Sequence, residues 1–188
     1  MKKLSLLFLV LAVSLTACKK KKEEIKVEEE VTKAEVVKTK KIKIALNAKS
    51  GTNATGNVVF KEEDGSVTMT AIISGLEAGA HAIHIHDKSD CSSPDGKSAG
   101  GHWNPTNKPH GKWGATKGYH KGDIGNFIAD ENGNGTISFT TDEWCIGCGD
   151  ATKDIVGKGV IVHAGADDFT SQPSGAAGAR VSCAGIIE

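Results

Sequence analysis

Short alternating runs separated by glycine-rich turns constrain the fold of this chain more than any other feature. Apolar and polar residues alternate from Ile44 to Ala48 and again from Ala82 to His86, which is the two-residue period of a β-strand. An Asp64-Gly65 pair joins two β-rich runs, as is typical of a hairpin. No segment keeps a helical period, so these patterns predict an all-β domain, an antiparallel sandwich or barrel.

Two long segments lack the pattern of short strands, one from His86 to Asp123 and the other from Ala164 to Arg180. Glycine accounts for 23 of the 188 residues, which exceeds its ordinary share of about 7% and suits turns and long shaped loops. Loops of this length in a compact domain are usually functional. We therefore expect the functional residues to lie in or beside these two loops.

The first 18 residues have the pattern of a bacterial export signal. Two lysines precede an apolar stretch from Leu4 to Leu15, which is too short for a helix that crosses a bilayer. Leu15-Thr16-Ala17-Cys18 resembles the site at which bacterial lipoproteins are cleaved and lipidated. We expect residues 1–17 to be a signal peptide and Cys18 to carry the lipid. The protein would then be anchored in the bacterial cell envelope, facing the periplasm or the cell surface; the alternative is a plain secretory signal.

Residues 18–43 are almost all Lys, Glu, Val, Ile and Thr, and they cannot bury enough apolar surface to fold alone. We expect them to form a charged, flexible linker before a folded domain at 44–188. Residues 1–43 hold 12 Lys and 6 Glu, whereas residues 44–188 hold 11 basic and 17 acidic residues. An acidic domain argues against nucleic acid as its partner.

Seven histidines indicate the chemistry of the domain: His81, His84, His86, His102, His110, His120 and His163. His84 and His86 lie two apart in a strand pattern, so both imidazoles point to one face. The next three, with Asp123, supply three imidazoles and one carboxylate, which match a tetrahedral zinc site. His163 ends an apolar strand and could return to the first pair. Imidazoles without thiolates favour copper and zinc over iron–sulfur clusters.

These residues stand in order within a series of motifs. The motifs are Gly79-Ala80-His81-Ala82-Ile83-His84-Ile85-His86, Gly101-His102-Trp103-Asn104-Pro105, His110-Gly111, His120-Lys121-Gly122-Asp123-Ile124-Gly125-Asn126, Val162-His163 with Ala166-Asp167-Asp168, and Gly178-Ala179-Arg180-Val181-Ser182-Cys183. From about Ile44 to Glu188 the sequence resembles the copper–zinc superoxide dismutase family, here in a bacterial lipoprotein form. The resemblance implies an eight-stranded antiparallel Greek-key sandwich or flattened barrel with two long functional loops.

The resemblance also implies a role for each site residue and one copper and one zinc ion per subunit. The copper ligands would be His84, His86, His102 and His163, and the zinc ligands would be His102, His110, His120 and Asp123. His102 would bridge both metals and carry a proton during turnover. Asp167 would link a copper histidine to a zinc histidine, and His81 would support the copper site without binding metal. Arg180 would guide the anionic substrate.

Four cysteines remain once Cys18 is set aside, and an exported protein retains disulfides. The resemblance implies a bond between Cys91 and Cys183. Cys145-Ile146-Gly147-Cys148 is additional to the family pattern. A C-x-x-C pair can be redox-active or bind metal, but a small structural disulfide is the favoured interpretation.

The predicted function is dismutation of superoxide to oxygen and hydrogen peroxide by copper redox cycling, which would protect the cell envelope. One alternative is an envelope protein that binds or buffers copper on the same scaffold without turnover. A second is an interaction domain in which zinc only holds a loop. The complete copper set and Arg180 favour the enzyme. The sequence leaves monomer and homodimer open.

Overall fold

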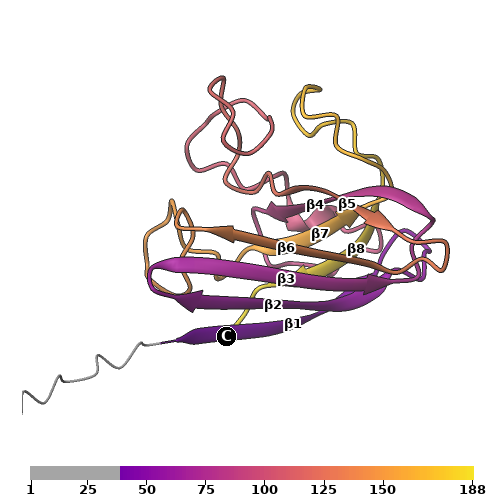
Figure 1. The fold of residues 1–188 in the computed structure, drawn as a ribbon, viewed down its shortest axis with the longest axis horizontal. Coiled ribbons are helices and arrows are strands. Elements are labelled where there is room, and N and C mark those ends of the chain that lie inside the picture. The colour runs from indigo at the N-terminus through magenta and orange to yellow at the C-terminus, as the bar shows by residue number, and fades with distance from the viewer. Residues whose placement is uncertain (1–38) are drawn as a thin grey trace, which may run out of the picture. The chain divides into compact units, whose positions relative to one another are not determined.

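The computed structural model describes residues 39–188. The predicted signal peptide 1–17, Cys18 and the linker up to residue 38 lie outside this part. Within it, eight antiparallel strands close into a barrel, and the predicted fold class is confirmed (Figure 1). The strands are β1 (Lys40–Ala48), β2 (Thr55–Glu63), β3 (Ser66–Ser74), β4 (Gly79–His86), β5 (Gly125–Ala129), β6 (Gly135–Thr141), β7 (Gly159–His163) and β8 (Arg180–Gly185). None of the helical structure between residues 39 and 188 could cross a membrane.

The strand order around the barrel is β1-β2-β3-β6-β5-β4-β7-β8, which contains Greek-key crossovers. The chain passes from β3 to β4 over two intervening strands, so β4 pairs with β5 on one side and with β7 on the other. In the second pairing His84 lies opposite Ile161, and Ile83 lies opposite Val162. The end of β7 therefore places His163 beside the histidines of β4.

The start of β1 differs from the predicted domain boundary. The strand begins at Lys40, so residues 40–43 belong to the barrel and not to the linker. Ile42 pairs with Phe60 of β2 and is buried, while Lys41 and Lys43 point outward. The inward apolar position at Ile42 continues the alternation upstream, although the flanking lysines give the segment the composition of a linker.

The hairpin between β2 and β3 forms at the predicted Asp64-Gly65 pair. Both residues have positive φ angles, 50° and 75°, and the flanking Glu63 and Ser66 are paired. Positive φ at both central positions is typical of the tight turn whose twist matches that of antiparallel strands. This local rule is the reason why a two-residue pattern could predict the turn.

The hydrophobic core lies inside the barrel and gives β4 two different faces. Ile83 and Ile85 are fully buried and belong to the core cluster. His84 and His86 alternate with them and are equally buried, but they face the long loops outside the barrel. Figure 1 shows both long loops leaving the barrel next to β4 and β7. A strand that is buried on both faces is a rigid support for a site.

Two disulfides cross-link the described chain, Cys91–Cys183 and Cys145–Cys148, separated by 92 and 3 residues. The chain-entropy relation gives about 4–5 kcal/mol for the first and about 2 kcal/mol for the second. The long-range bond attaches the first long loop to β8 beside Ile161 and Ala99, so it holds the loop on the barrel.

Candidate metal centre

Four imidazoles meet at the outer face of β4 and form the first group of the site. Two come from β4, one from the end of β7 and one from the first long loop: His84, His86, His163 and His102. One nitrogen of each lies within 4.8 Å of the others. The rings of His84 and His102 are closest, with centroids 4.0 Å apart. Sequence reasoning proposed the same four residues for copper.

The first long loop lies across β4 through backbone hydrogen bonds. Trp103 donates to the carbonyl of Ile85 at 2.9 Å, and Gly122 donates to the carbonyl of Trp103 at 3.0 Å. Ile85 in turn donates to the carbonyl of Gly122 at 2.9 Å. A β-carbon at Gly122 would collide with the Ile85 carbonyl, so only glycine permits this approach. These bonds fix His102 between the strand and the rest of the loop.

His102, His110, His120 and Asp123 form the second group, and one ligand atom of each also lies within 4.8 Å of the others. The Asp123 carboxylate lies 2.8 Å from His102 Nδ1, 3.0 Å from His110 Nδ1 and 3.2 Å from His120 Nδ1. Its Oδ2 also accepts backbone N–H groups from Gly111 and His120, at 3.1 and 2.7 Å. All four residues come from one loop, and His102 belongs to both groups.

Backbone carbonyls fix the tautomers of two copper-side rings. His86 Nδ1 donates to the carbonyl of Gly100 at 2.9 Å, and His163 Nδ1 lies 3.4 Å from the carbonyl of Gly178. A carbonyl only accepts, so each ring carries its proton on Nδ1 and leaves a lone pair on Nε2. Both Nε2 atoms are buried without a hydrogen-bond partner.

Asp167 connects the two groups from the second long loop. Its carboxylate accepts from His84 Nε2 and from His110 Nε2, each at 2.9 Å. Asn126 holds its backbone through two hydrogen bonds of 2.8 Å. A β-carbon at Gly175 would overlap the Asp167 carboxylate, and the φ angle of +69° also favours glycine there. One buried carboxylate therefore orients one ring of each group.

Six buried ring nitrogens lack any hydrogen-bond partner in the described part of the chain. They are His84 Nδ1, His86 Nε2, His102 Nε2, His110 Nδ1, His120 Nδ1 and His163 Nε2. Leaving a buried polar atom unsatisfied costs about 1–3 kcal/mol, so six in one place need an explanation. Cations on either side of His102 would satisfy all of them, and all-imidazole and imidazole–carboxylate donor sets fit copper and zinc.

Burial and the two buried carboxylates shift the pKa values of individual histidines in opposite directions. Burial lowers the pKa of His102 to about 4 and that of His163 to about 3, with further lowering by neighbouring rings. Burial opposes charge on His110 too, but the carboxylates of Asp123 and Asp167, 3.0 and 2.9 Å from its ring nitrogens, raise the pKa of this ring to about 9. Burial alone would raise the pKa of both carboxyls, yet the histidine hydrogen bonds hold them well below the usual range.

The comparisons with known proteins agree with this geometry. The family model for copper/zinc superoxide dismutase (SODC) matches residues 54–186. The chain belongs to that family. It is 34% identical over 142 residues to "Superoxide dismutase [Cu-Zn] 2" of Aquifex aeolicus, an alignment that covers 72% of this chain and 82% of the relative.

Solved structures with the same fold include a SOD-like protein from Bacillus subtilis, with a TM-score of 0.68 and 30% identity. That match covers 77% of this chain and 97% of the other. The clock protein EA4 aligns with a TM-score of 0.66 and 33% identity, over 78% of this chain and 94% of the other. These structures share the fold of the present chain, whereas copper, zinc and dismutase activity are implied by the family model and the Aquifex relative.

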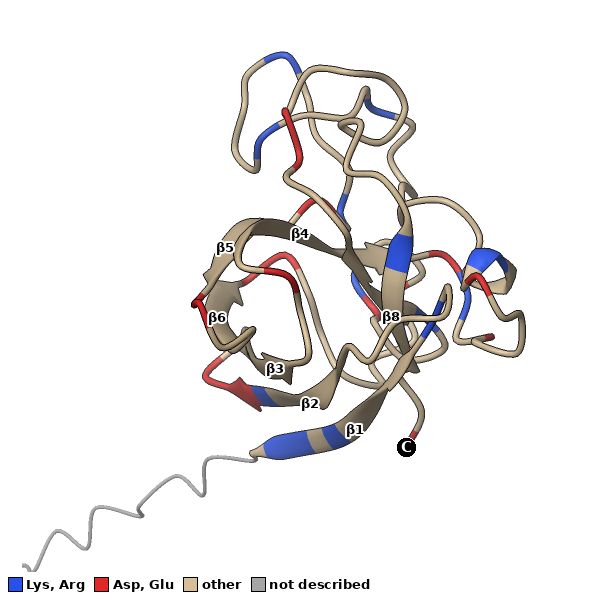
Figure 2. Cartoon of the chain, turned by 90° about the vertical axis from the view of Figure 1, so that its right-hand side faces the viewer, with Lys and Arg blue, Asp and Glu red and all other residues tan. Residues whose placement is uncertain are grey.

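The mouth of the candidate metal centre is a hollow of about 370 Å³ lined by His86, His102, His163 and Arg180, among others. Arg180 opens β8, and its guanidinium donates to the carbonyl of Gly96 at 2.8 Å, which holds the cation in place. The stretch 96–122 holds five lysines and no acidic residue, although the domain is acidic overall. Figure 2 shows basic residues spaced along the loops that extend from the barrel beyond β4.

His81 lies behind the copper side and belongs to neither group. Its two ring nitrogens lie 2.8 Å from the carbonyls of His163 and Glu77. The ring therefore links β4 to the backbone of a candidate ligand.

Sequence reasoning missed three residues that position the site. Gln172 accepts from the backbone N–H of His110 and donates to its carbonyl, each at 2.9 Å, so it joins the two long loops. Asn126 and Gly175 act on Asp167 as described above. Gln172 and Asn126 act on partners 62 and 41 residues away, and a single sequence contains no signal of such pairings.

Proposed function

We propose that this protein dismutates superoxide to oxygen and hydrogen peroxide. Copper would be held by His84, His86, His102 and His163, and zinc by His102, His110, His120 and Asp123. The observation that carries the proposal is the convergence of six unpartnered ring nitrogens from both sides of His102. A zinc-only loop anchor would leave the three other copper-side histidines without a purpose.

Copper, when bound, supplies one-electron redox chemistry that zinc cannot supply. The chain provides the remaining elements. Arg180 keeps its charge at any physiological pH and can attract and orient an anion at the mouth. Asp167 and the Gly100 carbonyl keep the rings of His84 and His86 in the required tautomers.

His102 is the residue placed to move a proton. Its Nδ1 faces Asp123 in the zinc group and its Nε2 faces the copper group. Burial lowers the pKa of the ring to about 4, so a proton taken at Nε2 is readily given to a reduced anionic substrate. A ring shared by both groups can exchange one proton in each cycle without displacement of the other ligands.

We further propose that the chain is a lipoprotein of the bacterial cell envelope, anchored through Cys18 and protecting the envelope from superoxide. The export pattern of residues 1–17 and the charged residues that follow support this location. Mass spectrometry of the native N-terminus is expected to show lipid on Cys18. An unmodified Cys18 thiol, or a start elsewhere, would contradict it.

The deciding experiment combines metal analysis of the purified protein with a xanthine oxidase-coupled superoxide assay. One copper, one zinc and rapid dismutation are expected for each chain. Diffraction at the two absorption edges is expected to locate two unlike cations on either side of His102. Copper binding without turnover would instead indicate a copper-buffering protein on the same scaffold, and a single cation would refute the shared-imidazole arrangement.

A further inference from the structure

The loop between β6 and β7 contains a second chemical group that the metal centre does not use. Trp144-Cys145-Ile146-Gly147-Cys148 lies in this loop, and its two cysteines are joined by a disulfide. Cys145 is 7% exposed and follows the buried Trp144, whereas Cys148 is exposed. One sulfur-bearing residue is therefore open to solvent while its partner is packed against the protein.

Hydrogen bonds hold this loop in place independently of the disulfide. The carboxylate of Asp154 accepts backbone N–H groups from Gly147, Gly149 and Val156, at 3.0, 2.8 and 3.0 Å. The first two donors flank Cys148. The conformation around the exposed cysteine is thus held by a carboxylate as well as by the disulfide.

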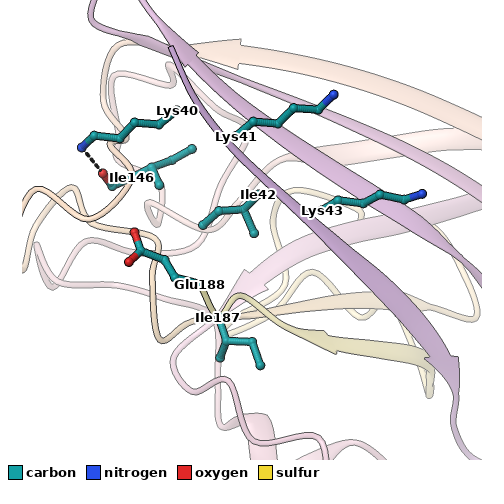
Figure 3. A pocket seen from close by; sticks show the side chains of 7 residues that line it. All are labelled: Lys40, Lys41, Ile42, Lys43, Ile146, Ile187 and Glu188. Atoms are coloured by element: carbon teal, nitrogen blue, oxygen red, sulfur yellow. Dashed lines mark hydrogen bonds between the residues drawn. The ribbon is translucent and has the colours of Figure 1, made fainter. Parts of the chain in front are cut away.

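The buried end of the pair is held in the same way. Cys145 donates its backbone N–H to Lys153 at 2.9 Å and accepts from Ile155 at 3.1 Å. Ile146 donates to the Glu62 carboxylate at 3.1 Å. Figure 3 shows the ammonium of Lys40, at the start of β1, at the carbonyl of Ile146. These contacts anchor the loop to β1 and β2 without any contribution from sulfur.

The disulfide adds little constraint to a loop that is already held. It joins residues only three positions apart, whereas Cys91–Cys183 joins residues 92 positions apart. The stabilisation by a disulfide rises with the size of the ring it closes, so the short ring contributes less than the long one. A bond that contributes little to the fold and exposes one sulfur-bearing residue has the features of an exchangeable disulfide.

We propose that Cys145–Cys148 is a thiol–disulfide exchange site whose substrates are accessible thiols. A substrate thiolate attacks the sulfur of Cys148, a new S–S bond forms there, and Cys145 leaves with the electron pair as a thiolate. A second substrate thiolate then attacks the substrate sulfur of the mixed disulfide and releases Cys148. The pair gains two electrons and two protons, and the two substrate thiols become one disulfide. The reverse reaction reduces a substrate disulfide.

The first test compares the two disulfides within the folded, metal-loaded protein. The protein is incubated with reduced glutathione in one arm and with reduced thioredoxin in the other, quenched with acid, alkylated and mapped by mass spectrometry. Cys145 and Cys148 are expected to become alkylated at least roughly 10-fold faster than Cys91 and Cys183 in one arm or both, because exchange depends on access to sulfur. The preferred arm identifies a small or a protein thiol as the substrate. Equal resistance of the two disulfides in both arms would overturn the proposal.

The second test uses two single variants, each of which keeps one cysteine of the Cys145–Cys148 pair. Cys145→Ser leaves the exposed Cys148 and is expected to accumulate a mixed disulfide with Ellman's reagent. Cys148→Ser leaves the buried Cys145 and is expected to react far more slowly. Equal reactivity of the two variants would refute the assigned roles.

The double variant, Cys145→Ser with Cys148→Ser, separates exchange from a structural role. It is expected to lower the thermal midpoint by no more than about 10 °C, as about 2 kcal/mol implies, to keep the metal content and dismutase activity, and to lose the exchange reaction. A large fall in the thermal midpoint would show that the disulfide is a structural cross-link and would overturn the proposal.

Discussion

The two ligand groups share His102 but are constructed differently. Three of the four copper-side residues lie on strands β4 and β7, whereas all four zinc-side residues lie on the loop between β4 and β5. The copper side contains imidazoles alone, and the zinc side adds the carboxylate of Asp123. The strand-borne group is positioned by the barrel itself. The loop-borne group joins residues of a single loop, so an ion bound there would help to hold the loop.

This difference suits different tasks. A redox ion benefits from ligands that keep their positions when its charge changes, and strands that are buried on both faces provide this. A structural ion contributes folding free energy by joining segments that would otherwise separate. Asp167 contacts one ring of each group, so the two tasks are not independent.

Removing a strand-borne ligand is expected to have the largest effect. His84→Ala deletes a fully buried imidazole from β4, and we expect copper binding and dismutation to be lost while zinc and the fold are retained. Metal analysis, circular dichroism and the superoxide assay test the three parts separately. Dismutation at the parent rate would show that the copper assignment is wrong.

Removing the loop-borne carboxylate is expected to weaken zinc binding more than copper binding. Asp123→Asn keeps the shape but removes the charge facing three histidines. Zinc affinity is expected to fall by more than the roughly 10–100-fold that loss of a supporting residue costs. Hydrogen exchange should increase along 104–122 and remain unchanged in β4 and β7. Equal loss of copper and zinc would contradict the division between the groups.

The pH dependence of metal binding should distinguish the two sides. The raised pKa of His110, about 9, means that zinc must displace a proton at neutral pH, so zinc affinity falls as the pH drops below that value. Displacing one proton gives about 10-fold per pH unit, or roughly 100-fold between pH 8 and 6. The lowered pKa of His163, about 3, leaves that copper-side ring neutral over the same range. Competition titrations at several pH values should show zinc released before copper.

Substitution of Asp167, whose carboxylate lies between the two groups, is expected to have an intermediate effect on metal binding. Asp167→Asn removes the charge that orients His84 and His110, and both metal affinities are expected to fall roughly 10–100-fold. The neighbouring Asp168→Asn is a matched control, because Asp168 is exposed and contacts only its own loop. An effect on one metal alone would mean that Asp167 supports only that group.

Sequence reasoning succeeded where a local rule applies. The two-residue period of β4 predicted that His84 and His86 share a face, and Asp64-Gly65 predicted the hairpin between β2 and β3. The strand pattern suggested that His163 could return to His84 and His86, and the resemblance to the family assigned it to copper. The structure brings all the proposed ligands together.

Prediction from the sequence failed where the structural role of a residue depends on a partner that is distant in the sequence. The β1 boundary depends on burial of Ile42 against β2, which the composition of the linker concealed. Asn126 and Asp167 are 41 residues apart, and Gln172 and His110 are 62 residues apart. Polar residues of these types occur in any loop, so only the tertiary fold identifies them as supports of the site.

The smallest effect is expected at Arg180, which belongs to neither ligand group. Its side chain lines the mouth and is held by the carbonyl of Gly96, so Arg180→Ala should leave both metals bound. Loss of one guiding charge is expected to lower kcat/KM for superoxide roughly 10-fold and to flatten its dependence on ionic strength. Arg180→Lys keeps the charge without the planar guanidinium and should recover most of the salt dependence but not all of the rate. Unchanged kinetics in Arg180→Ala would assign the attraction of the anion to the lysines of 96–122 instead.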